Sequence, residues 1–166
     1  MQTFIQMIFG SLSFLKTYQA RAAHPLLLMR PLTGGSYALL DPSGHQKFAL
    51  PQRYQVLAAN GAIQPTGLVQ LRYFQLTPEE APVFIDAAKT VVAHQPTRTN
   101  NAYASVMVAT KTHELILMTQ WQTTTAKSAA QATPAFAAID QFAHRAAKGA
   151  GYHEAYYQIE HPDADA

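Results

Sequence analysis

The fold is decided by residues 68–94, which read LVQLRYFQL followed by TPEEAPVFIDAAKTVVAH. Residues 68–76 are rich in strand-forming side chains and predict a β-strand. Thr77 then suits the N-terminal cap of a helix, Pro78 its first helical position, and Glu80 the far side of a capping box. Apolar residues recur at helical spacing from there to about residue 94. The stretch therefore predicts a strand followed directly by an amphipathic helix.

Downstream of this stretch, the chain continues with clearly marked strands and helices. We expect two strands, a short helix, a longer helix and a last strand, at residues 103–109, 114–122, 124–132, 133–148 and 152–159. The order from residue 68 onward is then β-α-β-β-α-β. This is the ferredoxin-like arrangement, in which an antiparallel sheet carries its helices on one face.

Upstream of the stretch, the N-terminal part is predicted to be rich in strands. Strand-forming runs separated by turn signals occur at residues 3–9, 26–29, 37–40, 47–50 and 54–58, with one short helix after Gly10. Residues 61–67, which include Pro65, make the best boundary between the two parts. We therefore predict an α+β fold with a β-rich subdomain at residues 1–66, a ferredoxin-fold domain at residues 67–160 and a tail at residues 161–166.

Composition excludes several classes of function. The chain has 166 residues and no cysteine, so disulfides, thiolate catalysis and cysteine-bound metals are excluded. Its 12 basic and 10 acidic residues form no basic cluster, so we expect no nucleic-acid partner. No apolar run approaches about 18 residues, so we expect no membrane partner. The apolar residues 1–15 lack a basic start and read as part of the fold rather than a signal peptide, which favours a cytoplasmic location.

Histidine spacing gives one candidate group on the predicted final helix. None of the seven histidines falls in an HxH or HxxxH pair, so we predict no metal site. Asp140 and His144, however, are four residues apart on one helix and can meet on its surface. A carboxylate that orients an imidazole would suit a general base or an axial ligand of heme iron. A solvated surface pair is the alternative.

Two further residues are candidates because of their place on predicted strands. Trp121, the only tryptophan, ends the strand at residues 114–122 and is either a core anchor or the wall of a cavity. Arg72 and Tyr73 alternate along the strand at residues 68–76, so they point to opposite faces of the sheet. A buried arginine is costly without a partner. Arg72 therefore either lines a polar cavity, where it could hold an anion, or is exposed.

Part of the sequence resembles a known family. Residues 115–123, LILMTQWQT, and residues 133–136, TPAF, resemble the antibiotic-biosynthesis-monooxygenase (ABM) superfamily. In that family a strand ends in Trp and a polar residue, and a helix beginning with a small residue and an aromatic follows. The resemblance covers residues 68–159 and implies the dimeric α+β barrel. Residues 14–16, 24–29 and 37–40 (FLK, HPLLLM and YALL) resemble the longer two-part members, namely the HmoB-like heme-degrading monooxygenases and the TRAP-type signal transducers.

The resemblance also implies where a heme-degrading site would lie. Heme degraders of this superfamily use an Asn on the first ABM strand, a Trp on the short helix and an iron-binding His on the long helix. These positions fall on Arg72, Ala130 and Asp140, so all three residues differ from that pattern. His144, one turn further along, is then the histidine of the long helix that could bind heme iron.

Two functions are therefore carried as hypotheses. The first is a monooxygenase, heme-degrading or cofactor-independent, that acts on heme or another planar aromatic ligand through Arg72, Trp121 and Asp140. The second is a non-catalytic binding or regulatory protein on the same fold, as a monomer or a homodimer. Small side chains on the two last helices favour open space beside the sheet. We expect a cavity of roughly 300 Å³ or more that touches Trp121 or Arg72. The residues that favour it are Ala129, Ala130, Ala137 and Ala138.

Overall fold

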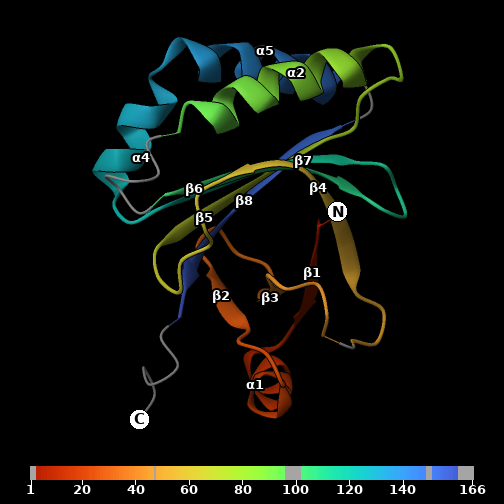
Figure 1. Ribbon diagram of the computed structural model, residues 1–166, viewed down its shortest axis with the longest axis vertical. Coiled ribbons are helices and arrows are strands. Elements are labelled where there is room, and N and C mark those ends of the chain that lie inside the picture. Colours follow the sequence, from red (N-terminus) through yellow and green to blue (C-terminus); the bar gives the residue numbers. More distant parts are fainter. Residues whose placement is uncertain (1–2, 47, 96–101, 149–150, 161–166) are drawn as a thin grey trace.

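The computed structural model describes residues 3–46, 48–95, 102–148 and 151–160. Its helices pack on the outside of one barrel of strands, so the α+β class is confirmed (Figure 1). The helices are α1 (Leu12–Arg21), α2 (Glu80–Ala93), α4 (Thr124–Gln131) and α5 (Pro134–Lys148). The strands are β1 (Thr3–Gly10), β2 (Leu27–Pro31), β3 (Tyr37–Asp41), β4 (Gln52–Asn60), β5 (Leu68–Phe74), β6 (Tyr103–Ala109), β7 (Leu115–Trp121) and β8 (Tyr152–Ile159).

The sheet closes on itself in the order β1-β3-β2-β8-β5-β7-β6-β4. Every strand pair is antiparallel. The run β8-β5-β7-β6 is the strand order of a ferredoxin-like β-α-β-β-α-β unit, as the sequence predicts. The strands of the N-terminal part complete the barrel through the pairs β2–β8 and β4–β6. The expected position of the division, residues 61–67, falls between β4 and β5.

Closure within one chain refines the expectation drawn from the sequence. A dimeric α+β barrel joins the sheets of two chains, whereas here each half of a single chain supplies four strands. The interior is shared, because Met7 and Leu40 of one half pack in the same buried cluster as Leu71, Met107 and Met118 of the other. The barrel is therefore complete without a second chain, and the choice between monomer and homodimer remains a prediction.

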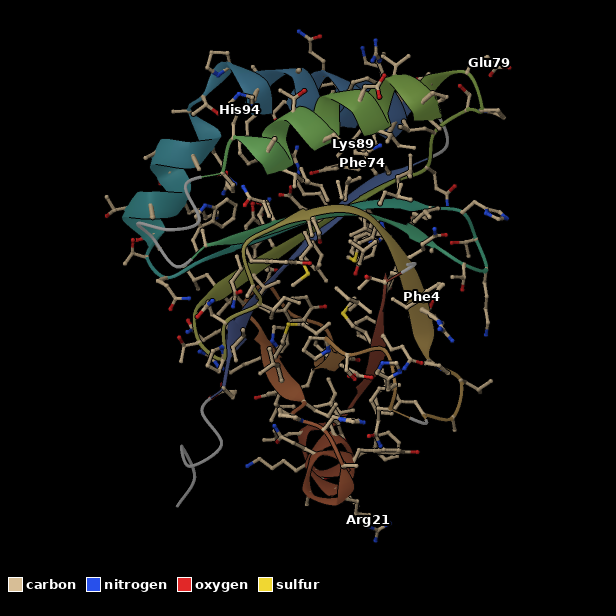
Figure 2. All side chains as sticks on the ribbon, in the orientation of Figure 1. Phe4, Arg21, Phe74, Glu79, Lys89 and His94 are labelled. Carbon is tan, nitrogen blue, oxygen red and sulfur yellow. The ribbon has the colours of Figure 1, made fainter. Side chains whose placement is uncertain are left out.

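Strand alternation sorts the side chains into two separate layers. On β5, Val69, Leu71 and Tyr73 join the cluster inside the barrel, while Phe74 joins the cluster under the helices. Phe74 lies against Phe84 of α2, with ring centroids 4.4 Å apart (Figure 2). Arg72 is on the helix side as well, because its partners come from α5 and β8. The opposite orientations expected for Arg72 and Tyr73 are confirmed, and they place Arg72 where the site forms.

Threonine hydroxyls lie at the N-terminal ends of two helices, although α2 begins two residues later than the sequence predicts, with Glu79 at its N-cap position. The Thr77 hydroxyl accepts a hydrogen bond from the backbone N–H of Glu80 at 3.2 Å, and the Thr123 hydroxyl accepts one from the N–H of Ala126 at 3.1 Å. In Figure 1, α2 and α5 lie over one face of the barrel and α1 lies at the opposite end. Over the residues that the structure describes, no helix has the length and apolar character needed to cross a membrane.

One predicted strand is wrong, at residues 47–50. Residue 47 lies outside the described residues, and residues 48–50 are not a strand. The buried carboxylate of Asp41 organises the preceding segment as a turn instead, because it accepts hydrogen bonds from the backbone N–H groups of Ser43 and Gln46 at 2.9 and 2.8 Å. Leu50 then has a positive backbone φ of 55°, which an extended strand cannot accommodate. The chain becomes extended only from β4 onward.

Candidate functional site

A cleft lies between strands β5 and β8 on one side and helices α4 and α5 on the other. It consists of an inner polar hollow of about 130 Å³ and an outer, more apolar hollow of about 270 Å³. Gln70 and Tyr156 line both hollows, so the two are adjacent. We call the outer hollow the Trp121 pocket. Its other lining residues are Leu32, Thr33, Leu68, Val69, Trp121, Thr124, Lys127 and Tyr157.

The inner hollow is organised by Arg72, whose side chain is only 7% exposed. Its Nη2 donates a hydrogen bond to Oδ1 of Asp140 on α5 at 2.8 Å, and its Nε donates one to the Tyr152 hydroxyl at 2.8 Å. Tyr152 in turn donates to Oε2 of Glu154 at 2.6 Å. The cation is therefore partnered from both a helix and a strand. The sequence leaves open whether Arg72 lines a polar cavity or is exposed. The structure shows that Arg72 is buried and lines a polar cavity.

The electrostatics of the inner hollow keep its arginine charged. Burial alone would lower the pKa of Arg72, but its hydrogen bonds and charge interactions with Tyr152 and Asp140 raise that pKa above its usual value. Burial raises the pKa of Tyr152, and its hydrogen bond to Glu154 raises it further. Tyr152 is thus a neutral hydrogen-bond donor to Glu154, and neither Arg72 nor Tyr152 is poised to exchange a proton near neutral pH.

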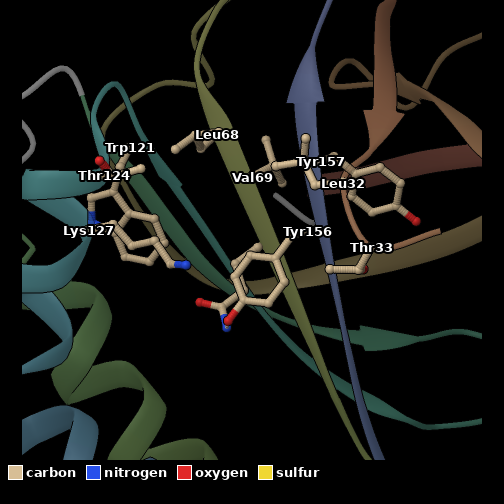
Figure 3. A pocket seen from close by; sticks show the side chains of 10 residues that line it. Leu32, Thr33, Leu68, Val69, Trp121, Thr124, Lys127, Tyr156 and Tyr157 are labelled. Atoms are coloured by element: carbon tan, nitrogen blue, oxygen red, sulfur yellow. Dashed lines mark hydrogen bonds between the residues drawn. The ribbon is translucent and has the colours of Figure 1, made fainter.

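The Trp121 pocket has an apolar floor and one charged side chain (Figure 3). Lys127 reaches from α4 toward Tyr156, and its Nζ lies 4.1 Å from the centre of that ring. The Tyr156 hydroxyl accepts a hydrogen bond from Nε2 of Gln70 at 2.8 Å, and Gln70 accepts one from Gln131 of α4 at 2.8 Å. These bonds fix the aromatic ring of Tyr156, so the pocket has a preformed aromatic surface.

Trp121 forms the opposite wall and is 1% exposed. Its ring lies 6.4 Å from that of Phe136 in the layer under the helices. The indole N–H is buried without a hydrogen-bond partner. The strand end that carries Trp121 is held close to Gly67, where a Cβ atom would lie 2.7 Å from the Trp121 carbonyl oxygen and φ is +110°. Trp121 is therefore both a core anchor and a cavity wall, the two alternatives that the sequence leaves open.

The structure brings only some of the predicted site residues together. Arg72 and Asp140 pair directly, and Trp121 lies in the adjoining hollow. His144 is exposed on α5 and lines neither hollow. Within the described part of the chain, Asp140 and His144 share no hydrogen bond or ion pair, because the buried Arg72 binds the carboxylate instead. In that same part no cluster of three His, Cys, Asp or Glu residues could hold a metal ion.

The open space expected from small alanines lies elsewhere. Ala129 and Ala130 line a hollow of about 430 Å³ between α2 and the junction of α4 with α5, away from the sheet. The Trp121 pocket, at about 270 Å³, is slightly smaller than the cavity of roughly 300 Å³ that the sequence predicts. Of the four alanines expected to open space beside the sheet, Ala129 and Ala130 line this hollow between helices, while Ala137 and Ala138 do not line it.

Four site residues escape sequence reasoning as members of the cleft, although a partial signal exists for each of them. Alternation places Gln70 beside Arg72 on β5, and it places Glu154 beside Tyr152 and Tyr156 on β8. Lys127 and Gln131 are four residues apart on α4, so they share a face. The register Arg72–Glu154 and Gln70–Tyr156 then assembles the cleft. That register is a long-range pairing, which the sequence alone does not supply.

Comparison with known proteins identifies the fold. No protein-family model matches the sequence, and no curated protein sequence matches it either. Solved structures do match over nearly the whole chain. A ferredoxin-fold protein of unknown function from Listeria monocytogenes 4b F2365, related to antibiotic biosynthesis monooxygenases, is 17% identical with a TM-score of 0.82. That match covers 97% of this chain and 96% of the other.

Two further structures have functional descriptions of their own. The heme-degrading enzyme LmHde from Listeria monocytogenes is 18% identical with a TM-score of 0.78, and the match covers 95% of this chain and 99% of that one. A major regulator of staphylococcal pathogenesis is 14% identical with a TM-score of 0.77 and the same coverage. The chain thus has the fold of ABM-related, monooxygenase-like proteins, as the sequence resemblance implies. At these identities the likeness extends to the fold alone.

Proposed function

We propose that this protein binds a small planar aromatic ligand in the Trp121 pocket and does not use heme. The single observation that supports this function is the pocket itself, which is lined by Trp121 and by a Tyr156 ring that Gln70 holds through a hydrogen bond. Its volume of about 270 Å³ is just below the roughly 300–1,000 Å³ typical of small-molecule sites. A molecule of one or two fused rings suits such a pocket.

The residues of the cleft do not fit a heme. At the position of the iron-binding histidine, Asp140 is committed to the ion pair with Arg72. The inner hollow has about 130 Å³, far less than a macrocycle needs. His144, the remaining candidate ligand, is exposed on the outer side of α5. A heme-degrading activity like that of LmHde is therefore not proposed for this chain, although the fold is shared.

The proposal is a binding function rather than a reaction. The groups that line the Trp121 pocket include neither a carboxylate nor a histidine that could act as a general base. A non-catalytic binding or regulatory role was the second sequence hypothesis, and the likeness to a staphylococcal regulator is compatible with it. Cofactor-independent oxygenation in this pocket would require the bound ligand to supply the reactive group itself.

A paired titration tests the proposal, and Trp121 is a built-in reporter because the chain has no other tryptophan. Addition of 2-naphthoate should quench Trp121 fluorescence to saturation, with a Kd on the order of 100 µM for a ligand of this size. Heme should give no stoichiometric Soret band. A sharp one-to-one heme spectrum, or fluorescence that 2-naphthoate leaves unchanged, would refute the proposed function.

A further inference from the structure

We infer that the ligand of the Trp121 pocket carries an anionic group such as a carboxylate, and that Lys127 is the residue that selects it. The inference rests on the proposed binding function and names its ligand class. Lys127 is the one charged side chain among the described residues that line the pocket. The hydroxyls of Thr33 and Thr124, which also line the pocket, can donate hydrogen bonds to the same group. The pocket therefore offers a cation and hydroxyl donors to an anionic group.

Lys127 is also placed to meet such a group. The residue is half-buried on α4, with its ammonium 4.1 Å from the Tyr156 ring centre. Across the described chain, Lys127 has no ion pair, and its recorded contact is this cation–π interaction. An aromatic acid whose ring lies along Tyr156 would bring its carboxylate to the ammonium. The charge would then gain a partner that Tyr156 alone does not provide.

The other charges of the cleft do not compete for this role. The sequence suggests Arg72 as an anion contact, but Arg72 is already engaged by Asp140 and Tyr152. Glu154 accepts a hydrogen bond from Tyr152 and lines the inner hollow, not the Trp121 pocket. Asp140 likewise lines only the inner hollow. The anion contact therefore moves from the buried arginine to Lys127 at the rim.

The test compares 2-naphthoate with its neutral isostere 2-naphthamide by isothermal titration calorimetry. The native protein should bind the acid about tenfold more tightly than the amide, a ratio in keeping with one charge-assisted hydrogen bond. Lys127→Met should reduce that ratio to about one, chiefly by weakening the binding of the acid. Lys127→Arg should retain the preference. The ratio should also shrink as salt is raised, because the ammonium is partly exposed.

The controls separate this inference from the proposed function. Lys89→Met removes an exposed lysine of α2 (labelled in Figure 2) that lines neither hollow of the cleft, and should leave both Kd values unchanged. If neither compound binds the native protein, the proposed function fails. If both bind equally, or if Lys127→Met keeps the preference for the acid, the selection by Lys127 is wrong while the binding function stands. The native comparison needs no variant, so a poorly folded variant cannot rescue the idea.

Discussion

Replacing Trp121 with alanine should lower the free energy of unfolding by about 3–5 kcal/mol, the usual range for deleting a large buried aromatic side chain. Trp121 is one of the largest fully buried side chains and belongs to the cluster between sheet and helices. Its loss leaves a cavity beside Phe136 and also removes the wall of the proposed pocket. Urea unfolding followed by far-UV circular dichroism measures the effect, since the variant lacks the only tryptophan.

Trp121→Phe is the matched control for this change. The substitution keeps an aromatic wall and removes the indole N–H, which is buried without a partner. Because an unsatisfied buried donor itself costs about 1–3 kcal/mol, its removal offsets part of the lost packing. We expect a destabilisation below about 1.5 kcal/mol. An effect of Trp121→Phe as large as that of Trp121→Ala would mean that the indole N–H is satisfied in solution and that the wall needs the full indole.

The second large effect is an asymmetry within the Arg72–Asp140 ion pair. Asp140→Ala should cost about 2 kcal/mol, because it leaves a buried guanidinium with Tyr152 as its remaining side-chain partner. Arg72→Met should cost less, under about 1 kcal/mol, since it removes the buried charge together with its desolvation penalty and keeps the apolar stem. The remaining Asp140 side chain is 56% exposed, so water can solvate it.

An exposed ion pair between α5 and α2 serves as the control for this asymmetry. Arg145 lies 3.7 Å from Glu80, with side chains 57% and 36% exposed. Arg145→Met should change the free energy of unfolding by no more than about 0.5 kcal/mol, as is usual for exposed pairs.

The coupling between Arg72 and Asp140 is measured by chemical denaturation of Arg72→Met, Asp140→Ala and the double variant. If Arg72→Met lowered the free energy of unfolding as much as Asp140→Ala does, the predicted asymmetry would be absent. Burial of the arginine would then not determine the cost of breaking the ion pair.

The elements of the fold could be predicted because their signals are local. The Thr77 hydroxyl accepts a hydrogen bond at the start of α2, as its position suggests, and strand alternation places Tyr73 inside the barrel and Arg72 outside it. Local signals of this kind do not predict closure of the barrel within one chain. It depends on the pairs β2–β8 and β4–β6, which join residues far apart in the sequence. The wrong strand at residues 47–50 has a cause of the same kind, since Gln6 of β1 donates hydrogen bonds to the preceding turn, to Oδ2 of Asp41 at 3.3 Å and to the Gln46 carbonyl at 2.9 Å.

The site shows the same division between local and long-range information. Arg72, Trp121 and Asp140 could be singled out by residue type, but the sequence paired Asp140 with His144 because they are neighbours on one helix. The buried arginine has the greater need for a carboxylate, and it lies across the cleft on β5. In the sequence, nothing distinguishes Lys127 from other lysines on helix surfaces. Its contact with the Tyr156 ring depends on the register of β5 and β8. Its role therefore depends on the fold and not on a motif.

The most direct measurement is a crystal structure of the protein grown with 2-naphthoate. The account predicts that the fused rings lie between Trp121 and Tyr156, with the carboxylate within hydrogen-bonding distance of Nζ of Lys127. The Arg72–Asp140 pair should remain intact beside the bound ligand. Naphthoate bound instead in the hollow between α2 and the α4–α5 junction, or displacing Asp140 from Arg72, would contradict the assignment of the Trp121 pocket as the binding site.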